Sequence, residues 1–173
     1  MDKLHIITPV KDSIDLTLQT IKSVKDSNIR VPFIYKVYND FSTDENTTIL
    51  EEASKSIGFS LINLSDMTSH PSPNYLLVLQ HAQQEALEDN ADLLIIESDV
   101  VVEKDTIQQL VDGAYQQKNC GIAAAVTVDE SGTVNYPYLY AKKWKDRDVH
   151  WFVSRRSLSR RITAFPFITS NQA

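Results

Sequence analysis

The chain has 173 residues, of which 42% are hydrophobic and 23% charged, which is typical of a globular protein and excludes a disordered or fibrous one. This length suffices for one domain with a substantial core and is too short for two full ones. The one cysteine, Cys120, excludes a disulfide framework, and the sequence contains neither a signal peptide nor an apolar run of about 18 residues. We therefore expect a soluble protein of a reducing, cytoplasmic compartment.

The first predicted strand is the short apolar run Leu4–Thr8, which ends at Pro9. A helix follows it, because apolar residues recur at helical spacing in the next segment. Asp12 and Ser13 stand directly before this helix and are its predicted caps.

The second strand, Phe33–Tyr38, alternates and is rich in residues that favour strands. It runs into Asn39 and Asp40, and a helix is predicted over roughly Asp44 to Lys55. Ser42 followed by Glu45 fits a capping box at the start of that helix.

The remaining elements continue the alternation of strands and helices. They are a strand over Phe59–Leu64, a loop over Met67–Asn74, a helix over Tyr75–Glu88, a strand over Ala91–Ile96, a helix capped by Asp105, and a strand over Gly121–Val128. This order favours a largely parallel sheet covered by helices on both faces.

Acidic residues follow two of these strands. Glu97 and Asp99 come directly after Ala91–Ile96, and Asp40 comes after the second strand. Because alternate residues of a strand point the same way, Glu97 and Asp99 are able to converge on one metal ion or one sugar. Parallel-sheet enzymes bind their ligands outside such strand ends. Taken alone, however, Glu97 and Asp99 fit a solvated turn after the strand equally well.

Glycine-rich phosphate-binding loops are absent. The chain has four glycines, and none lies in the turn after the first strand, so a dinucleotide-binding fingerprint and a P-loop are both excluded. That turn contains Pro9 and Lys11 instead. A diphosphate ligand would therefore require a metal ion held by acidic residues.

Three segments together resemble the family 2 glycosyltransferases with the GT-A fold, a nucleotide-sugar-binding α/β sandwich. Ile6–Asp12 is similar to the family's first strand and turn, Val37–Asp44 to its strand that ends in paired acids, and Leu94–Asp99 to its Asp-x-Asp element. Asn74 stands where the family commonly begins a helix. The resemblance covers about residues 4–128 and lies in the combination and spacing of these segments.

The resemblance implies a role for each matching residue. Thr8, Pro9 and Val10 would line the pocket of the base, and Asp40 would hold the uracil or ribose. Glu97 would contact the ribose or the metal, and Asp99 would bind Mn²⁺ or Mg²⁺. His81 stands where many members place an arginine and is a candidate contact to the diphosphate, as implied by position alone.

The sequence departs from the family pattern at several positions. Phe41 replaces a glycine, Asn39 replaces the first of the paired acids, and Glu97 replaces the first Asp of the metal motif. No acidic residue after Asp99 is a convincing general base, which inverting members use to deprotonate the acceptor hydroxyl. We therefore expect residues 1–173 to form a single donor-binding domain, truncated before the complete acceptor half.

The formal charge of −6 is unevenly distributed. Residues 1–141 hold nine Lys and Arg against 21 Asp and Glu, whereas residues 142–173 hold eight basic residues against two Asp. The basic segment 142–161 suits phosphates, an acidic partner or peripheral binding to the inner face of a membrane, and a solvated mobile loop is an equal alternative.

The predicted partners are a nucleoside-diphosphate sugar donor, with UDP-sugar favoured, and a glycan or lipid-linked acceptor; no nucleic acid is expected. Two other functions remain open. A sugar nucleotidyltransferase would share the sheet and the metal-binding carboxylates, but it needs a glycine-rich loop after the first strand. A non-catalytic nucleotide-sugar-like or interaction module would fit the missing base and the substitutions at positions 41 and 81.

Overall fold

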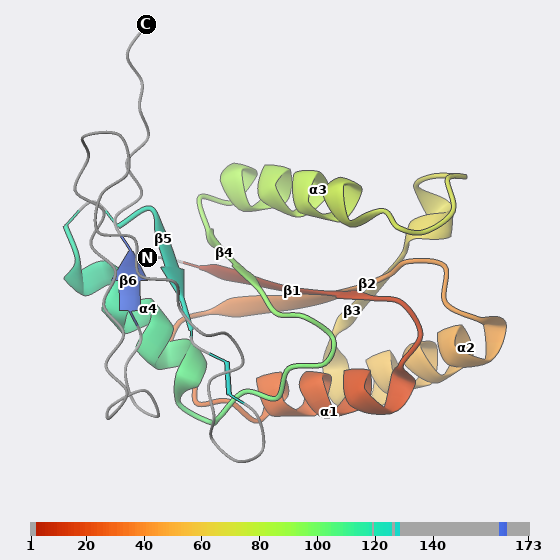
Figure 1. Ribbon diagram of the computed structural model, residues 1–173, viewed down its shortest axis with the longest axis horizontal. Coiled ribbons are helices and arrows are strands. Elements are labelled where there is room, and N and C mark those ends of the chain that lie inside the picture. The colour runs from red at the N-terminus through yellow and green to blue at the C-terminus, as the bar shows by residue number, and fades with distance from the viewer. Residues whose placement is uncertain (1–2, 119, 126, 129–162, 166–173) are drawn as a thin grey trace, which may run out of the picture. The chain divides into compact units, whose positions relative to one another are not determined.

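A computed structural model of the chain describes residues 3–118, 120–125, 127–128 and 163–165. The chain divides into two compact units, residues 1–107 and 108–173. The first unit contains the sheet and the helices that position the predicted site (Figure 1). The basic segment 142–161 lies outside the described residues.

The first unit alternates strands and helices as predicted. Its elements are β1 Leu4–Val10, α1 Ile14–Lys25, β2 Phe33–Asn39, α2 Asp44–Ala53, a π-helical turn Ser54–Gly58, β3 Ser60–Asn63, a 3₁₀ turn Leu64–Asp66, α3 Tyr75–Glu88 and β4 Asp92–Ile95. The helix α4, Thr106–Gln116, begins at the end of this unit.

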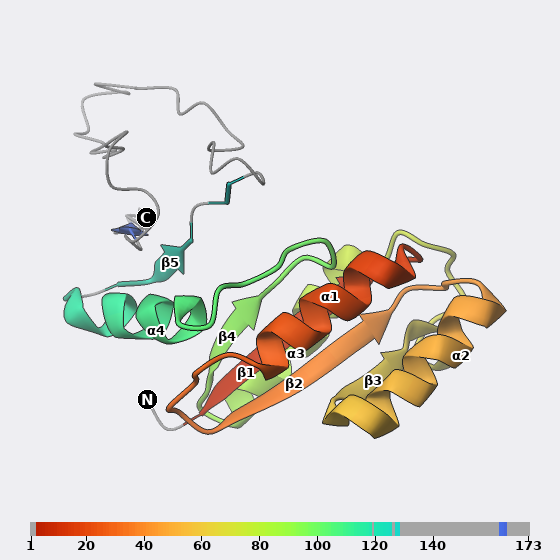
Figure 2. The same ribbon diagram turned by 90° about the horizontal axis from the view of Figure 1, so that it is seen from below.

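The four strands form one parallel sheet in the order β3-β2-β1-β4. Helices α1 and α2 cover one face and α3 covers the other, as Figures 1 and 2 show from two directions. The chain moves outward from β1 to β2 and β3, and then returns across the sheet to β4 on the other side of β1. The strand order therefore reverses at β1, which is the position where open α/β sheets bind ligands.

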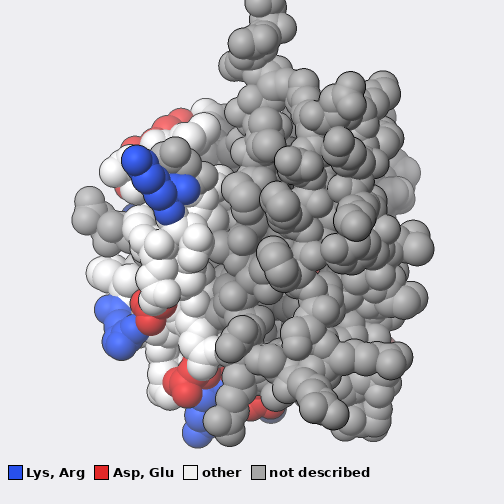
Figure 3. All heavy atoms as spheres, turned by 60° about the vertical axis from the view of Figure 1, so that its left-hand side comes forward, with Lys and Arg blue, Asp and Glu red and all other residues white. Residues whose placement is uncertain are grey.

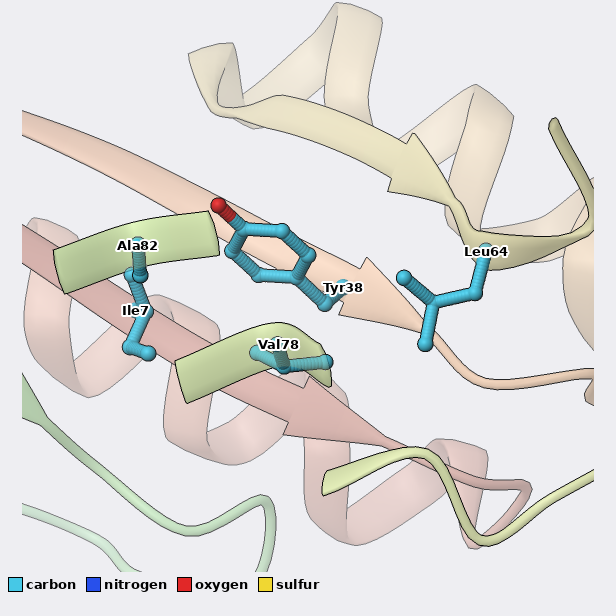
Figure 4. Packing of buried hydrophobic residues seen from close by; sticks show 5 residues of the cluster. All are labelled: Ile7, Tyr38, Leu64, Val78 and Ala82. Carbon is cyan, nitrogen blue, oxygen red and sulfur yellow. The ribbon is translucent and has the colours of Figure 1, made fainter. Parts of the chain in front are cut away.

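The core between the sheet and α3 explains why this helix lies where it does. Ile7 of β1 and Tyr38 of β2 pack with Leu64 and with Val78 and Ala82 of α3, and all five are at most 1% exposed (Figure 4). Burying an Ile, Leu or Val side chain contributes about 1.5–3 kcal/mol to folding. The apolar face of α3 thus fixes the helix over β1 and β2 and fixes its first residues at the carboxyl edge of the sheet.

Proline does not end the first strand as the sequence suggested. β1 continues through Pro9 to Val10, which pairs with Asn39 of β2. The backbone polar groups of Ile7 point toward β4, where the Ile7 carbonyl accepts a hydrogen bond from the Ile96 N–H. Residue 9 faces the same side, where β4 has already ended, so the missing N–H of proline leaves no bond unmade.

The three residues predicted to cap α1 and α2 have different outcomes. Thr43, and not Ser42, is the N-cap of α2, where its side chain accepts a hydrogen bond from the Asn46 N–H. Ser13 stands at the N-cap of α1, but it is in a left-handed conformation and makes no capping hydrogen bond. Asp12 does not cap α1, because its carboxylate is engaged at the start of α2.

The predicted fifth strand does not join the parallel sheet. β5 is restricted to Ile122–Ala124, and it pairs antiparallel with β6, Thr163–Phe165, in a separate two-stranded sheet. Within the described residues, the parallel sheet therefore has four strands, and β4 is at one edge.

Charged side chains of both signs mingle on the face drawn in Figure 3. There the Lys and Arg side chains of the described residues lie among acidic and uncharged ones.

Candidate functional site at the carboxyl edge of the sheet

The predicted site residues come together at one edge of the parallel sheet. Val10 ends β1, Asp40 follows β2, and Glu97 follows β4. Since β1 pairs with both β2 and β4, the two acidic strand ends lie on either side of the end of β1. In Figure 1 the carboxyl ends of β1 and β2 lie on the right, where α3 begins.

Asp40 is almost enclosed by the loop before α3. It is 7% exposed, and its carboxylate accepts three hydrogen bonds: from Ser72 Oγ at 2.8 Å, from the Asn74 N–H at 2.8 Å and from Asn74 Nδ2 at 2.7 Å. Burial alone would raise the pKa of Asp40, but the bonds from Asn74 and Ser72 outweigh it and hold the pKa below its usual value. The carboxylate is therefore ionised and anchors the start of α3.

Glu97 and Asp99 differ in how far they are already engaged. Glu97 is exposed, and its Oε1 accepts a hydrogen bond of 2.8 Å from the phenol of Tyr75, the first residue of α3. Burial and the contact with Glu97 raise the pKa of Tyr75 to about 12, so the phenol is a donor at neutral pH. Asp99 is exposed and makes no side-chain hydrogen bond or ion pair with a described residue.

The three residues predicted to line the base pocket differ in accessibility. Thr8 is fully buried, and its hydroxyl lies 2.9 Å from the phenol oxygen of Tyr35. Val10 is 2% exposed, whereas Pro9 keeps part of its surface accessible. Of these three side chains, Pro9 is the one that is able to offer a surface to a ligand without rearrangement.

Asp12 joins the loops that follow β1 and β2. Its carboxylate accepts hydrogen bonds from the Thr43 N–H at 2.9 Å and from Asn46 Nδ2 at 3.1 Å, which hold the pKa of Asp12 below its usual value. Its own N–H donates to Ser42 Oγ at 2.9 Å. The two loops are thus held together at the edge where the strands end.

Backbone strain is concentrated at the same edge. Asp12, Ser13 and Phe41 have φ angles of 53°, 49° and 57°, a left-handed region that non-glycine residues rarely adopt. Phe41 stands where the family has glycine, but its half-buried side chain packs against the core under α3. Such strain persists only where neighbouring contacts hold the backbone in place.

His81 lies on α3 within a network of polar side chains. Its Nδ1 is 3.0 Å from the phenol oxygen of Tyr38 and 3.5 Å from Glu85 Oε2, and Lys36 donates to the other oxygen of Glu85. Burial, and then the carboxylate of Glu85, raise the pKa of Tyr38. One ring nitrogen of His81 is therefore engaged inside this network, and the predicted contact to a diphosphate stays a prediction.

Sequence reasoning missed the partners that hold the acidic residues. The sequence marks Tyr75 only as the start of a helix and Asn74 only as a position that resembles the family's. A signal was present, because Ser72 and Asn74 directly precede an apolar helix and are residue types that bond to backbone and carboxylate groups at such positions. What could not be inferred is that their partner is Asp40, more than 30 residues earlier.

A metal ion would have to bind here through few protein ligands. The described residues contain no group of three or more His, Cys, Asp or Glu side chains that could hold a metal. However, Mg²⁺ is usually bound through only one or two carboxylates together with substrate phosphates. The unengaged carboxylate of Asp99 and the free Oε2 of Glu97 fit this pattern.

The structure describes three acidic residues after Asp99, namely Glu103, Asp105 and Asp112, and no contact singles one of them out as a base; Glu103 is exposed. Asp105 accepts a hydrogen bond from Asn28, and Asp112 accepts one from Gln108 on the same helix. Four further acidic residues, Asp129, Glu130, Asp146 and Asp148, lie outside the described residues.

Comparison with known proteins supports the family suggested by the sequence. The model of the family described as "Glycosyl transferase family 2" matches residues 5–168, almost the whole chain. No curated protein sequence matches the chain.

Several solved structures are similar in fold. A mannosyltransferase from Pyrobaculum calidifontis, PcManGT, in complex with GDP-Man and Mn²⁺, has a TM-score of 0.52 at 15% identity over 72% of this chain and 35% of its own. TarS of S. aureus in complex with UDP-GlcNAc has a TM-score of 0.47 at 19% identity over 66% of this chain and 31% of its own. Glucosyl-3-phosphoglycerate synthase from Mycobacterium tuberculosis in complex with UDP has a TM-score of 0.48 at 15% identity over 69% of this chain and 42% of its own.

The chain therefore spans between 31% and 42% of the length of these three structures. At 15% identity, the likeness to PcManGT establishes the fold and not the substrates.

Proposed function

The chain belongs to glycosyl transferase family 2, and on this basis we propose that it carries the donor site of a glycosyltransferase. The enzyme would transfer a sugar from a nucleoside diphosphate, with UDP favoured, to a glycan or lipid-linked acceptor. The observation that carries the proposal is the placement of the two acidic strand ends, Asp40 and Glu97–Asp99, on either side of β1, where the strand order reverses.

The donor class follows from the family and from the edge of the sheet. The GT-A fold is shared with PcManGT, whose structure contains the nucleotide sugar GDP-Man and Mn²⁺. In this chain, the base is proposed to bind near Pro9, and the ribose near Glu97. The preference for UDP rests on the resemblance in the first two strands and is the part of the proposal that a comparison of nucleotides tests.

Asp99 is proposed to hold Mn²⁺ or Mg²⁺ at the diphosphate, so that Glu97, the other predicted ligand of the ion, is left to contact the ribose. When bound, the ion supplies a Lewis acid that neutralises charge on the departing diphosphate. Asp99 suits this role because its carboxylate is exposed and makes no hydrogen bond or ion pair with a described residue. Glu97 has the same charge as the family's Asp and a longer reach.

The proposed reaction transfers the sugar with inversion at the anomeric carbon. The bond from this carbon to a diphosphate oxygen breaks, the acceptor hydroxyl oxygen forms the new bond, and its proton passes to a general base. No residue is assigned as this base.

We propose that the whole protein acts in the cytoplasm, with the basic segment 142–161 favouring the inner face of a membrane. No helix in the described ranges is long and apolar enough to cross a bilayer.

The test is a comparison of nucleotide binding with turnover. Calorimetry with UDP, GDP and ADP in the presence of Mn²⁺ should give the tightest binding for UDP. Since no base is assigned, this chain alone should not transfer sugar to an added acceptor, but it should slowly hydrolyse a UDP-sugar to UDP and free sugar. Binding without any hydrolysis would favour a non-catalytic nucleotide-sugar-binding module. Binding of none of the three nucleotides would contradict the proposal, and formation of a UDP-sugar from UTP and a sugar phosphate would favour a nucleotidyltransferase.

A further inference from the structure

One short segment contacts both acidic strand ends. Residues 72–75 bring Ser72 and Asn74 to Asp40 after β2, and they bring Tyr75 to Glu97 after β4. Because β1 lies between β2 and β4, the segment connects the two sides of the proposed donor site. Its geometry depends on Asp40, which is nearly buried and bonded to both the backbone and the side chain of Asn74.

Tyr75 fixes one oxygen of Glu97 and leaves the other unengaged. Its phenol donates to Oε1 at 2.8 Å, whereas Oε2 makes no hydrogen bond with a described residue. The carboxylate plane is thereby restricted while one acceptor oxygen stays available. A flexible, exposed glutamate would otherwise sample several rotamers, and binding a ligand would have to order it.

The Tyr75–Glu97 contact contributes little to folding. Tyr75 is 41% exposed and Glu97 is also exposed, and interactions between solvated side chains add little to stability. The consequence of the contact is therefore the orientation of Glu97 rather than the stability of α3, which depends on the apolar residues beneath the helix.

We propose that Tyr75 is a positioning residue that orients Glu97 toward a ribose hydroxyl of the nucleotide donor. Glu97 Oε1 is held by the phenol, and Oε2 accepts the hydrogen bond from the ribose. This inference rests on the proposed function, since it requires a nucleoside diphosphate in the site. It adds a residue of α3 that the acidic motif itself does not contain.

The experiment compares UDP with 2′,3′-dideoxy-UDP, which lacks both ribose hydroxyls, by calorimetry in the presence of Mn²⁺. Tyr75→Phe keeps the ring and removes the hydrogen bond, and it should weaken UDP binding about three- to tenfold while leaving the binding of the dideoxy analogue unchanged. In a Glu97→Ala background, Tyr75→Phe should have no further effect, because the group that it orients is absent. Gln84→Ala, which removes a hydrogen bond to Glu88 on the same helix, is the matched control and should change neither affinity.

Each outcome decides for or against the proposal. An equal loss of affinity for both nucleotides would show that Tyr75 acts through the base, the diphosphate or the fold, and it would overturn the proposal. Unchanged affinities in Tyr75→Phe, or a full additional loss in the Glu97→Ala background, would overturn it as well. If the wild-type protein binds neither nucleotide, the proposed function fails and the ribose contact fails with it; this result is distinct from wild-type binding that Tyr75→Phe does not alter.

Discussion

Asp40 should contribute more to the stability of the loop before α3 than any exposed acid at this edge. Its carboxylate accepts three hydrogen bonds from Ser72 and Asn74, and a hydrogen bond to a charged group contributes about 1.5–3 kcal/mol. Ser72 and Asn74 are only half-buried and would regain water, so the contributions do not simply add. We expect Asp40→Ala to lower the free energy of unfolding by about 2–4 kcal/mol.

Asp40→Asn should have a smaller effect. Its amide oxygen still accepts from the Asn74 N–H and from Ser72, but its NH₂ group faces Asn74 Nδ2, which is also a donor. One hydrogen bond is therefore lost, at a cost of about 1–2 kcal/mol. Asp66→Ala is the control, because Asp66 is exposed and has no side-chain partner among the described residues.

Urea denaturation followed by circular dichroism measures the loss of stability, and amide hydrogen exchange locates it. The Asn74 N–H donates directly to Asp40, so its protection should fall in Asp40→Ala by more than the global change in stability accounts for. If Asp40→Ala is within about 0.5 kcal/mol of the wild type, as surface substitutions usually are, then Asp40 does not anchor the loop and is free for a ligand.

Three further predictions follow from the same edge and are independent of one another. Phe41→Ala and Phe41→Gly both remove the packed ring, but only glycine relieves the φ of 57°, so the glycine variant should be more stable by about 1 kcal/mol in urea denaturation; equal stabilities would show that the backbone relaxes. The pKa of Asp40 lies below its ordinary value of 3.8, so its stabilisation is present above that pH and lost as the pH falls through the folded-state pKa. The difference in free energy of unfolding between wild type and Asp40→Asn should therefore be constant above about pH 5 and shrink below about pH 4. A difference that grows toward acid pH would show that folding raises the pKa of Asp40 instead of lowering it. Asp99→Ala should leave the denaturation midpoint unchanged or slightly raised, since it removes an exposed acid from an acidic edge; unfolding of this variant would show that Asp99 has a structural role.

The parallel sheet and its helices could be predicted from the sequence because the pattern was local. The apolar run Ala91–Ile96 and the helical spacing over Tyr75–Glu88 gave elements that agree with the structure to within one residue at each end. The errors arose where distant contacts decide the local structure. Pro9 stays in β1 because β4 has ended beside it, and Asp12 turns away from α1 because the Thr43 N–H lies across the loop.

The positions of the acidic residues after the strands could be predicted from the sequence, but the environment of each carboxylate could not. Sequence alone could not show that Asp40 is almost buried and bonded three times, whereas Asp99 is exposed and unengaged. The difference depends on the loop 68–74, whose position is set by the packing of α3 on the sheet. Tyr75 follows this loop directly as the first residue of α3, and no sequence motif marks it as a site residue.

The central claim is that Asp99 holds a divalent ion at the diphosphate of a bound nucleotide. Calorimetry with UDP tests it most directly, with wild type and Asp99→Ala each measured in Mn²⁺ and in EDTA. We predict that wild type binds UDP in Mn²⁺ and loses most of this binding in EDTA, and that Asp99→Ala binds as weakly in Mn²⁺ as wild type does in EDTA. Equal binding by wild type in Mn²⁺ and in EDTA, or undiminished Mn²⁺-dependent binding by Asp99→Ala, would contradict the claim.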